Sequence, residues 1–346
     1  MLPLQAMDMN EQYMQRCLQL ALKGLGNVSP NPMVGCVIVH ENKIIGEGYH
    51  QQYGEAHAEV NAINSVIDKS LLSKSTLYVS LEPCNHFGKT PPCADLILKY
   101  QIPEVVIGIQ DPFEKVNGSG IKKLVDAGVR VTTGILENEC RELNKRFFTF
   151  HQQKRPYIIL KWAQSKDGFI GKKNQSVRIS NELTRIINNT WRTQEDAVLV
   201  GGVTARTDNP HLTARSIEGR NPKRIILSES GNLPSKLNVF DGNAPTIVYS
   251  KNNFSHANCE SVLIPDENAL SFILSDLYNK NIQSMIVEGG TSVLNQFIQN
   301  DLWDEIRIFE SDSLLEDGIL APPISLAISN TEQIGNNILK TIYRRK

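Results

Sequence analysis

The chain has 346 residues, 40% of them hydrophobic, which is long enough for two domains with a core each. Its 36 basic and 37 acidic residues give a net charge of −1 without a basic stripe, which argues against a nucleic-acid partner held by phosphate contacts. No apolar run reaches the length of a membrane span, and the N-terminus lacks the pattern of a secretory signal. We therefore expect a soluble cytoplasmic protein.

The first half alternates helical and strand patterns, which predicts a layered α/β sheet. Its first helix has Asn10 available as N-cap and Gly24 just past its end. The expected elements are helix 10–23, a hairpin of strands 34–39 and 43–49, a helix after His57, strand 76–81, helix 94–100, strand 104–109, helix 121–127 and strand 129–132.

The second half is again predicted to be α/β. The boundary is expected in the polar stretch 150–156, so that the domains span residues 1–152 and 153–346. The expected elements are strands 157–162, 197–202, 224–228, 245–250, 284–290 and 305–309, with helices 181–192, 269–280 and 292–298.

A split pair of motifs points to metal chemistry. His57-Ala58-Glu59 is followed by Pro83-Cys84 and, nine residues after Cys84, by Cys93. One imidazole and two thiolates make a three-ligand zinc set that leaves a fourth position open for an activated water. Glu59 is then placed to carry protons without binding the metal. An H-x-E followed by P-C and a second Cys is the signature of zinc nucleobase deaminases.

The spacing requires His57 to stand at a helix start, because residues two apart within a helix point to different sides. The apolar pattern after His57 fits such an entry, Cys84 follows a buried strand, and Cys93 opens another helix. The alternatives are a chance H-x-E, unrelated core thiols, or a disulfide between Cys84 and Cys93, which a reducing compartment disfavours. We interpret His86 as a residue of a solvated loop rather than as a ligand.

The C-x8-C spacing, with Gly-Lys-Thr-Pro-Pro inside it, resembles the deaminase domain of the bifunctional riboflavin-biosynthesis deaminase/reductase family. The second half resembles that family's reductase domain through Asp167-Gly168, the stretch 201–215 and Val287-Glu288-Gly289-Gly290. The resemblance implies a cytidine-deaminase-like α/β/α domain followed by a dihydrofolate-reductase-like α/β domain. It implies zinc-dependent deamination of a phosphorylated diaminopyrimidine ribotide and then NADPH-dependent reduction of its ribosyl group to ribityl. A homodimer or larger homo-oligomer is also implied.

The same resemblance assigns residues to each site. In the deaminase, His57, Cys84 and Cys93 bind zinc, Glu59 is catalytic, and the substrate positions are Asn31, His50, Lys89 and Asp111. An Asn-Pro turn would equally explain Asn31. The implied cofactor positions are Ala163, Thr204, Asp208, Ser228, Gly290, Thr291, Ser292, Val293, Leu294, Asn295 and Gln296. The reductase substrate positions are Ser176, Arg192, Leu212, Arg215 and Glu288. Asp208 or Glu288 is the expected proton source.

The chain departs from the family pattern at Phe113, where relatives carry Asn, at Arg178, where many carry Trp, and at Arg206-Thr207. Two other hypotheses remain open. One is a zinc deaminase of another nucleotide whose second domain serves assembly, which predicts turnover of free cytidine and related bases. The other is a non-catalytic zinc-stabilised binding protein, which predicts that Glu59→Gln leaves function intact.

Overall fold

The computed structural model describes residues 8–87, 91–173, 175 and 177–344. The chain divides into two compact units, Met1–Gln153 and Lys154–Lys346, which are taken one at a time. Of the helices within the described ranges, none combines the length and the apolar character needed to cross a membrane.

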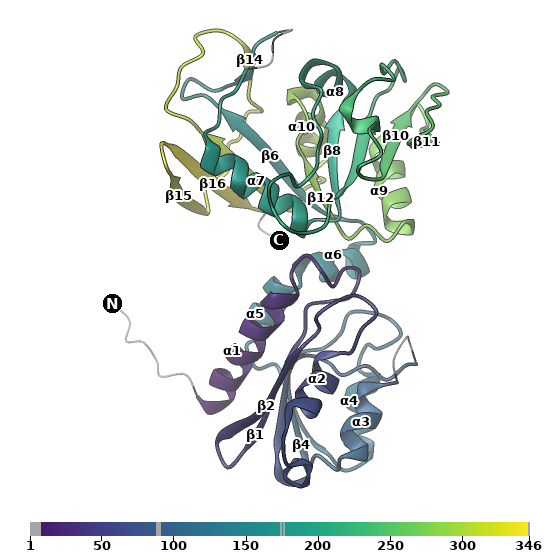
Figure 1. The fold of residues 1–346 in the computed structure, drawn as a ribbon, viewed down its shortest axis with the longest axis vertical. Coiled ribbons are helices and arrows are strands. Elements are labelled where there is room, and N and C mark those ends of the chain that lie inside the picture. The colour runs from purple at the N-terminus through teal and green to yellow at the C-terminus, as the bar shows by residue number, and fades with distance from the viewer. Residues whose placement is uncertain (1–7, 88–90, 174, 176, 345–346) are drawn as a thin grey trace. The chain divides into compact units, whose positions relative to one another are not determined.

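The first unit is built on one mixed sheet (Figure 1). Its described strands follow the order β2-β1-β3-β4-β5, with β1 antiparallel to β2 and β3 and with β3, β4 and β5 parallel. The carboxyl ends of β3 and β4 therefore lie at one edge. The strands are β1 (Gly35–His40), β2 (Lys43–Tyr49), β3 (Thr76–Leu81), β4 (Glu104–Ile109) and β5 (Arg130–Thr133).

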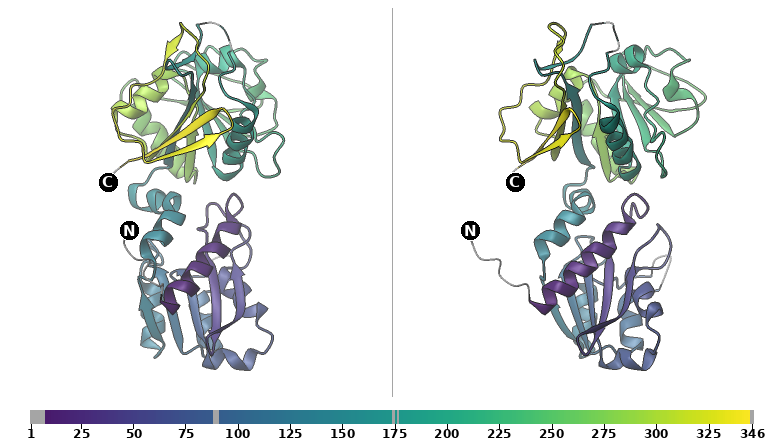
Figure 2. Two further views of the ribbon diagram at one scale, coloured as in Figure 1. Left: turned by 90° about the vertical axis from the view of Figure 1, so that its left-hand side faces the viewer. Right: turned by 60° about the vertical axis from the view of Figure 1, so that its left-hand side comes forward.

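Helices cover both faces of this sheet, as expected for an α/β/α domain (Figures 1 and 2). Two separate apolar clusters fill the layers, because alternate strand residues point to opposite faces. On one face lie α1 (Met9–Ala21), α5 (Glu137–Leu143) and α6 (Lys145–Gln153), and on the other α2 (Ala58–Ser65), α3 (Cys93–Lys99) and α4 (Ser119–Asp126). The short helix η1 (Leu22–Gly24) follows α1 directly, and η2 (Lys69–Lys74) lies between α2 and β3.

One local expectation was wrong. Asp8, not Asn10, caps α1, because its carboxylate accepts from the Glu11 N–H while Glu11 reaches back to the Asp8 N–H. The boundary stretch 150–156 begins inside α6, whose Phe147, Phe148 and Phe150 side chains are buried. Its polar residues follow the solvent side of that helix.

The second unit is a larger twisted sheet whose described strands follow the order β11-β10-β9-β8-β12-β6-β13-β16-β15. Neighbours from β11 to β13 are parallel, and β16 and β15 extend the sheet antiparallel. The strands are β6 (Tyr157–Gln164), β8 (Ala197–Gly201), β9 (Lys223–Leu227), β10 (Thr246–Ser250), β11 (Glu260–Leu263), β12 (Ser284–Val287), β13 (Glu305–Glu310), β15 (Asn330–Ile334) and β16 (Asn337–Tyr343). A small separate ribbon pairs β7 (Phe169–Gly171) with β14 (Ile319–Leu320).

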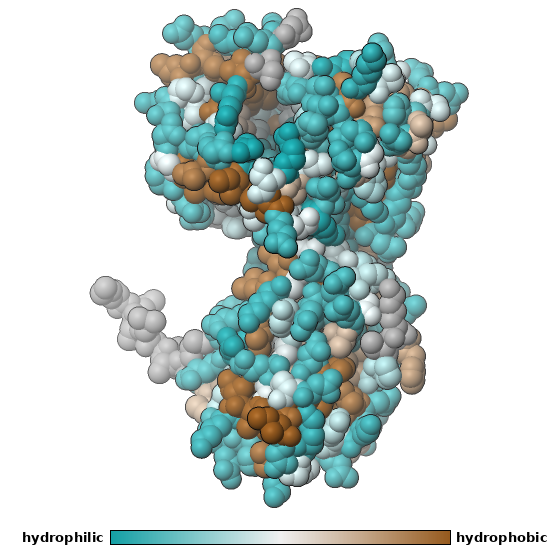
Figure 3. Space-filling model, viewed as in Figure 1, coloured by the Kyte–Doolittle hydropathy of each residue, from teal (hydrophilic) through white to brown (hydrophobic). Residues whose placement is uncertain are grey.

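Helices again cover both faces of this sheet. One face packs against α9 (Ala269–Asn279) and α10 (Thr291–Gln299), and the other against α7 (Glu182–Gln194), α8 (Gly202–Asp208) and η3 (Asn238–Phe240). The surface drawn in Figure 3 is mainly hydrophilic, with small apolar areas.

Candidate active sites

Three ligand atoms meet at the carboxyl edge of the first unit's sheet. His57 is the N-cap of α2, Cys84 follows β3, and Cys93 is the first residue of α3. His57 Nδ1 lies 3.5 Å from Cys84 Sγ and 3.3 Å from Cys93 Sγ, and the three ligand atoms lie within 4.8 Å of one another. This donor set, a nitrogen and two sulfurs, fits a zinc ion with one coordination position left open.

The electrostatics of the two thiols differ. A hydrogen bond from the Cys93 thiol lowers the pKa of Cys84 to about 4. Burial acts in the opposite direction, and His57 adds to the lowering. The Cys93 backbone N–H also points at Cys84 Sγ, at 3.4 Å. Cys84 in turn raises the pKa of His57. Both cysteines are free thiols rather than a disulfide. Cys84 is therefore the first of the two to become a thiolate, the form that binds metal.

Glu59 stands in the first turn of α2 with 3% of its surface exposed. Burial raises the pKa of its carboxyl to about 7, although the neighbouring His57 acts to lower it. A carboxyl that titrates near neutrality can both accept and release a proton during turnover. Glu59 does not belong to the three-ligand cluster.

Asn31 and His50 form a connected pair beside the cluster. His50 is buried, its Nδ1 lies 3.0 Å from the Ala56 carbonyl oxygen, and its Nε2 lies 3.0 Å from Asn31 Nδ2. These partners assign the proton to Nδ1 and make Nε2 the acceptor of the Asn31 amide. Burial lowers the pKa of His50, which favours this neutral ring. The His50 and His57 ring centroids are 5.5 Å apart.

Asp111 follows β4 and is 7% exposed. Its carboxylate accepts from the Phe113 N–H at 2.8 Å. Burial raises the pKa of Asp111 to about 7, and the charges of Glu82 and Cys84 act in the same direction. Lys89 lies outside the described residues.

Phe113 forms part of an aromatic group at this edge. Its ring centroid lies 6.0 Å from that of His86 and 4.9 Å from that of His151. His86 lies in a loop, half-buried against this ring, and does not belong to the three-ligand cluster.

In the second unit the expected cofactor positions follow the carboxyl ends of parallel strands. Thr204 lies in α8 after β8, Ser228 follows β9, and Gly290 is the N-cap of α10 after β12. A Cβ added at Gly290 would lie 3.3 Å from Thr204 Oγ1, and one at Gly202 would lie 2.7 Å from Ser228 Oγ. No side chain caps α10, so its first N–H groups can bind an anion such as a cofactor phosphate.

The other expected cofactor positions are less uniform. Ala163 lies in β6 opposite Phe309 of β13, and Asp208 is exposed at the end of α8. The side chains of Val293 and Leu294 pack into the core, so α10 can offer a cofactor its backbone there but not these side chains.

Glu288 is the centre of a buried charge cluster. It follows β12 and forms a bidentate ion pair with Arg192 of α7, with 2.7 and 3.2 Å between N and O. Burial favours the neutral acid, but Arg192 and Lys161, with a hydrogen bond from Asn188, lower the pKa of Glu288 to about 2. Burial lowers the pKa of Lys161, which lies in β6. Glu288 is thus a fixed anion beside two cations.

The remaining substrate positions lie near this cluster or outside it. Arg192 also donates to the Thr213 carbonyl oxygen at 3.1 Å. The pKa of exposed Arg215 is lowered mainly by burial and to a smaller degree by the charge of Arg192. Leu212 is 1% exposed and has a positive φ of 52°. Ser176 lies outside the described residues, and Arg178 is exposed and paired with Glu182.

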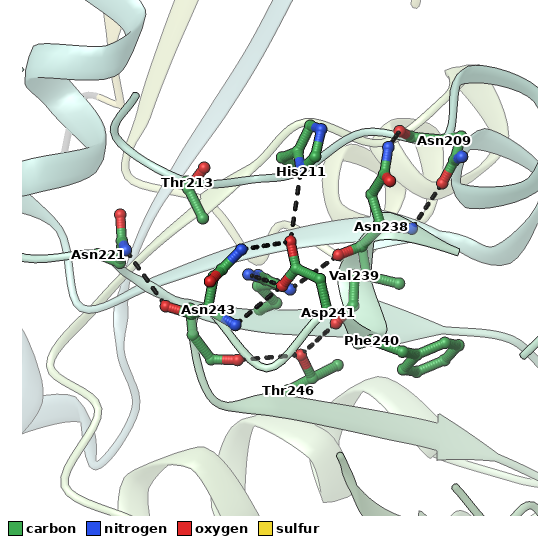
Figure 4. Close-up of polar contacts among 12 residues, drawn as sticks. Asn209, His211, Thr213, Asn221, Asn238, Val239, Phe240, Asp241, Asn243 and Thr246 are labelled. Atoms are coloured by element: carbon green, nitrogen blue, oxygen red, sulfur yellow. Dashed lines mark hydrogen bonds and ion pairs between the residues drawn. The ribbon is translucent and has the colours of Figure 1, made fainter. Parts of the chain in front are cut away.

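A network of polar side chains holds the segment between Asp208 and Arg215 (Figure 4). Asn238 donates to Asn209 twice, from its N–H to Oδ1 and from Nδ2 to the carbonyl, each at 2.7 Å. Asp241 lies 3.4 Å from His211 Nδ1 and accepts from Arg224 at 2.7 Å. This segment is therefore a supported loop rather than a loose one.

Asp241→Asn is expected to lower the free energy of unfolding of the second unit by about 1–3 kcal/mol at pH 7, because Arg224, which is fully buried, loses its ionic partner. Burial acts to raise the pKa of Asp241, but hydrogen bonds from Asn243 and Arg224 lower it to about 2. Since the folded-state pKa lies below the ordinary value of about 3.9, this stabilisation is present above pH ~4 and lost as the pH falls towards 2. The difference in free energy of unfolding between the wild type and Asp241→Asn should narrow over that pH range.

Urea titration followed by tryptophan fluorescence measures this effect, since Trp162, Trp191 and Trp303 all belong to the second unit. Asp266→Asn is the matched control, because Asp266 is exposed and contacts Lys251 only at 3.7 Å. A difference that stayed constant down to pH 2 would contradict the ionic explanation.

Several residues of these sites were not predicted. Glu82 stands two residues before Cys84, and Lys161 is a lone charge within an apolar strand. Both left a signal in the sequence, namely a charged residue inside or directly after a buried run. Asn238 and Asp241 left none, because they reach the site only through the fold.

The fold and the two sites define a class of protein, a zinc-dependent deaminase joined to a reductase built on a parallel sheet. The family models "Cytidine and deoxycytidylate deaminase zinc-binding region" and "RibD C-terminal domain" match residues 7–109 and 156–315. Riboflavin biosynthesis protein RibD of Aquifex aeolicus is 40% identical over 320 residues, covering 90% of this chain and 89% of its own. That of Bacillus amyloliquefaciens is 40% identical over 328 residues, with coverage of 91% and 88%.

The crystal structure of a diaminohydroxyphosphoribosylaminopyrimidine deaminase/5-amino-6-(5-phosphoribosylamino)uracil reductase from Thermotoga maritima superposes with a TM-score of 0.89. It is 38% identical, over 97% of this chain and 98% of that one. The chain belongs to the RibD family of riboflavin biosynthesis proteins. It is a deaminase and a reductase, with Zn²⁺ and NADPH as cofactors.

Proposed function

We propose that residues 1–152 deaminate 2,5-diamino-6-ribosylamino-4(3H)-pyrimidinone 5′-phosphate and that residues 153–346 then reduce the ribosyl group of the product to ribityl. The observation that carries the first step is the convergence of His57, Cys84 and Cys93 beside buried Glu59. The two activities named for the Thermotoga maritima relative support the pairing and its substrate class.

In the deaminase, His57, Cys84 and Cys93 would hold a zinc ion, which would supply an activated water for attack on the amine-bearing ring carbon. Glu59, whose pKa is about 7, takes a proton and delivers it to the departing amine. Asn31, oriented by His50, hydrogen-bonds the pyrimidine, and Asp111 contacts the substrate from the end of β4. Lys89 supplies a cation for the substrate phosphate.

In the reductase, bound NADPH would supply the hydride for the sugar carbon that is reduced. The N-terminus of α10 and the neighbouring Thr204 and Ser228 hold the cofactor. Arg192 and Arg215 hold the anionic part of the substrate, with Glu288 keeping Arg192 in place. Lys161, whose pKa is lowered by burial, joins Asp208 as a candidate proton donor, whereas the low pKa of Glu288 leaves that carboxylate without a proton to give.

His57→Ala tests the division of labour in one chain. We expect zinc to fall from one per chain to none and ammonia release to be lost, because the two remaining thiolates are too few protein ligands to hold the metal. NADPH oxidation with supplied deaminated intermediate should be unchanged. The readouts are metal content, ammonia, and the absorbance of the reduced cofactor.

His40→Ala is the control, since His40 bonds the Lys74 carbonyl away from the cluster. Full zinc and full deamination in His57→Ala would show that the metal site is elsewhere. Loss of both activities in a folded His57→Ala protein would show that the two sites are not independent.

We also propose that the enzyme is cytoplasmic and forms a homodimer or a larger homo-oligomer, as the family resemblance implies. Cell fractionation tests the first statement. Sedimentation of the full chain tests the second.

A further inference from the structure

Glu82 is a buried carboxylate that joins two parts of the deaminase site. It follows β3, two residues before Cys84, and only 4% of its surface is exposed. In the described part of the chain it has no ion-pair partner among the basic side chains. A buried charge is costly unless hydrogen bonds replace the lost water, so the partners of this group need an explanation.

Four backbone N–H groups supply those hydrogen bonds, and all belong to the segment after β4. Glu82 Oε2 accepts from the backbone N–H of Asp111 at 3.2 Å and from that of Gly118 at 2.9 Å. Oε1 accepts from Gly120 at 2.9 Å and from Ile121 at 3.2 Å. The carboxylate thus holds both ends of the stretch from Asp111 to the start of α4.

Helix α4 depends on this group for its N-terminus. Its N-cap is Gly118, which has a φ of 86° and makes no side-chain cap bond, so Glu82 takes the place of a capping residue from a distant part of the chain. A Cβ at Gly120 would collide with the Pro83 carbonyl oxygen, which places the helix start directly on the loop that carries Cys84. Asn85 adds a second bond, to the Ser119 carbonyl at 3.3 Å.

We propose that Glu82 is a positioning residue for deamination, fixing the segment that carries Asp111 against the loop that carries Cys84. The inference rests on the proposed role of Asp111 as a substrate contact. Asp111 receives this support at its own N–H, and its carboxylate is held by the Phe113 N–H. Substrate binding would then depend on Glu82 although Glu82 does not touch the substrate.

Glu82→Gln tests this in the zinc-loaded full chain. A carboxamide keeps the shape but replaces one oxygen with an NH₂ group, so two of the four N–H groups lose their acceptor whichever way it is turned. We expect KM for deamination to rise about tenfold or more, from ~1.4 kcal/mol or more of lost positioning, with a smaller change in kcat. Zinc content and NADPH oxidation should be unchanged.

A merely structural role would instead lower the yield of zinc-loaded protein and leave KM of the remaining active molecules unchanged. That result would overturn the proposal. Glu104→Gln is the matched control, because Glu104 is a half-buried carboxylate at the opposite end of β4, bonded to Thr76 and Arg130. If Glu82→Gln fails to bind zinc, Glu82→Asp, which keeps the charge on a shorter arm, decides in the same assay.

Asp111→Asn separates this proposal from the one on which it rests. Normal deamination in Asp111→Asn would remove Asp111 from the substrate site. The other outcome is that Asp111→Asn impairs deamination while zinc-loaded Glu82→Gln has the KM of the wild type. That result would support Asp111 as a substrate contact and overturn the role of Glu82. If both assignments hold, the double variant should lose less than the sum of the two single effects.

Discussion

Glu59→Gln is expected to slow deamination by on the order of a hundredfold or more, because the amide can neither take up nor release a proton. Zinc should remain at one per chain, since Glu59 is not among the three ligands. The residue is buried and its pKa lies at about 7, so the wild-type carboxyl is available in both protonation states near neutral pH. Ammonia release under saturating substrate measures the effect.

Glu47→Gln is the matched control, because Glu47 of β2 is a carboxylate of the same unit and is paired with Arg16 of α1. The reductase activity of the same molecules reports whether the chain is folded. A Glu59→Gln enzyme with zinc bound and deamination unimpaired would show that Glu59 does not carry the proton.

Glu288→Gln is expected to abolish most reductase activity, by on the order of a hundredfold, and to destabilise the second unit by about 3–5 kcal/mol. The reason is that Arg192 and Lys161 would be left buried without their counter-charge. Since the pKa of Glu288 is about 2, the wild-type carboxylate stays charged across any practical assay range. NADPH oxidation and tryptophan-monitored unfolding measure the two effects.

Glu310→Gln is the control in the same sheet, because the Glu310–Lys340 pair is less deeply buried and should contribute about 0–1 kcal/mol. Deamination by the same variant should be unchanged. If Glu288→Gln retained its stability and its NADPH oxidation, the charge cluster could not be a support for the substrate site.

Most of the central strands were predictable because burial on both faces makes them continuous apolar runs. Strand 104–109 is an example, and it appears as β4 with the expected bounds. β15 was not predicted, since four of its five residues are exposed and polar and it forms by pairing with β16. The cap of α1 was misplaced because Asp8 and Asn10 are both good capping residues, and the pattern of apolar residues does not distinguish them.

The candidate residues of the deaminase site stand out more clearly in the sequence than those of the reductase site. Metal ligands are restricted to a few residue types, so His57, Cys84 and Cys93 stand out in the printed sequence. The cofactor positions depend mostly on backbone and on glycine, as the close approach of Gly290 to Thr204 illustrates, and such contacts leave only a weak compositional signal.

The sequence by itself determined the kind of chemistry, because ligand types, the H-x-E spacing and the order of strands and helices are local properties. Only the tertiary structure decided which groups pair with one another around that chemistry. Glu82 reaches the N–H of Asp111, Asn238 reaches Asn209, and Arg192 reaches Glu288, across 29, 29 and 96 positions of the chain. Such pairs exist only once the packing of both faces of each sheet has fixed where the loops lie, since no local pattern encodes a partner that distant.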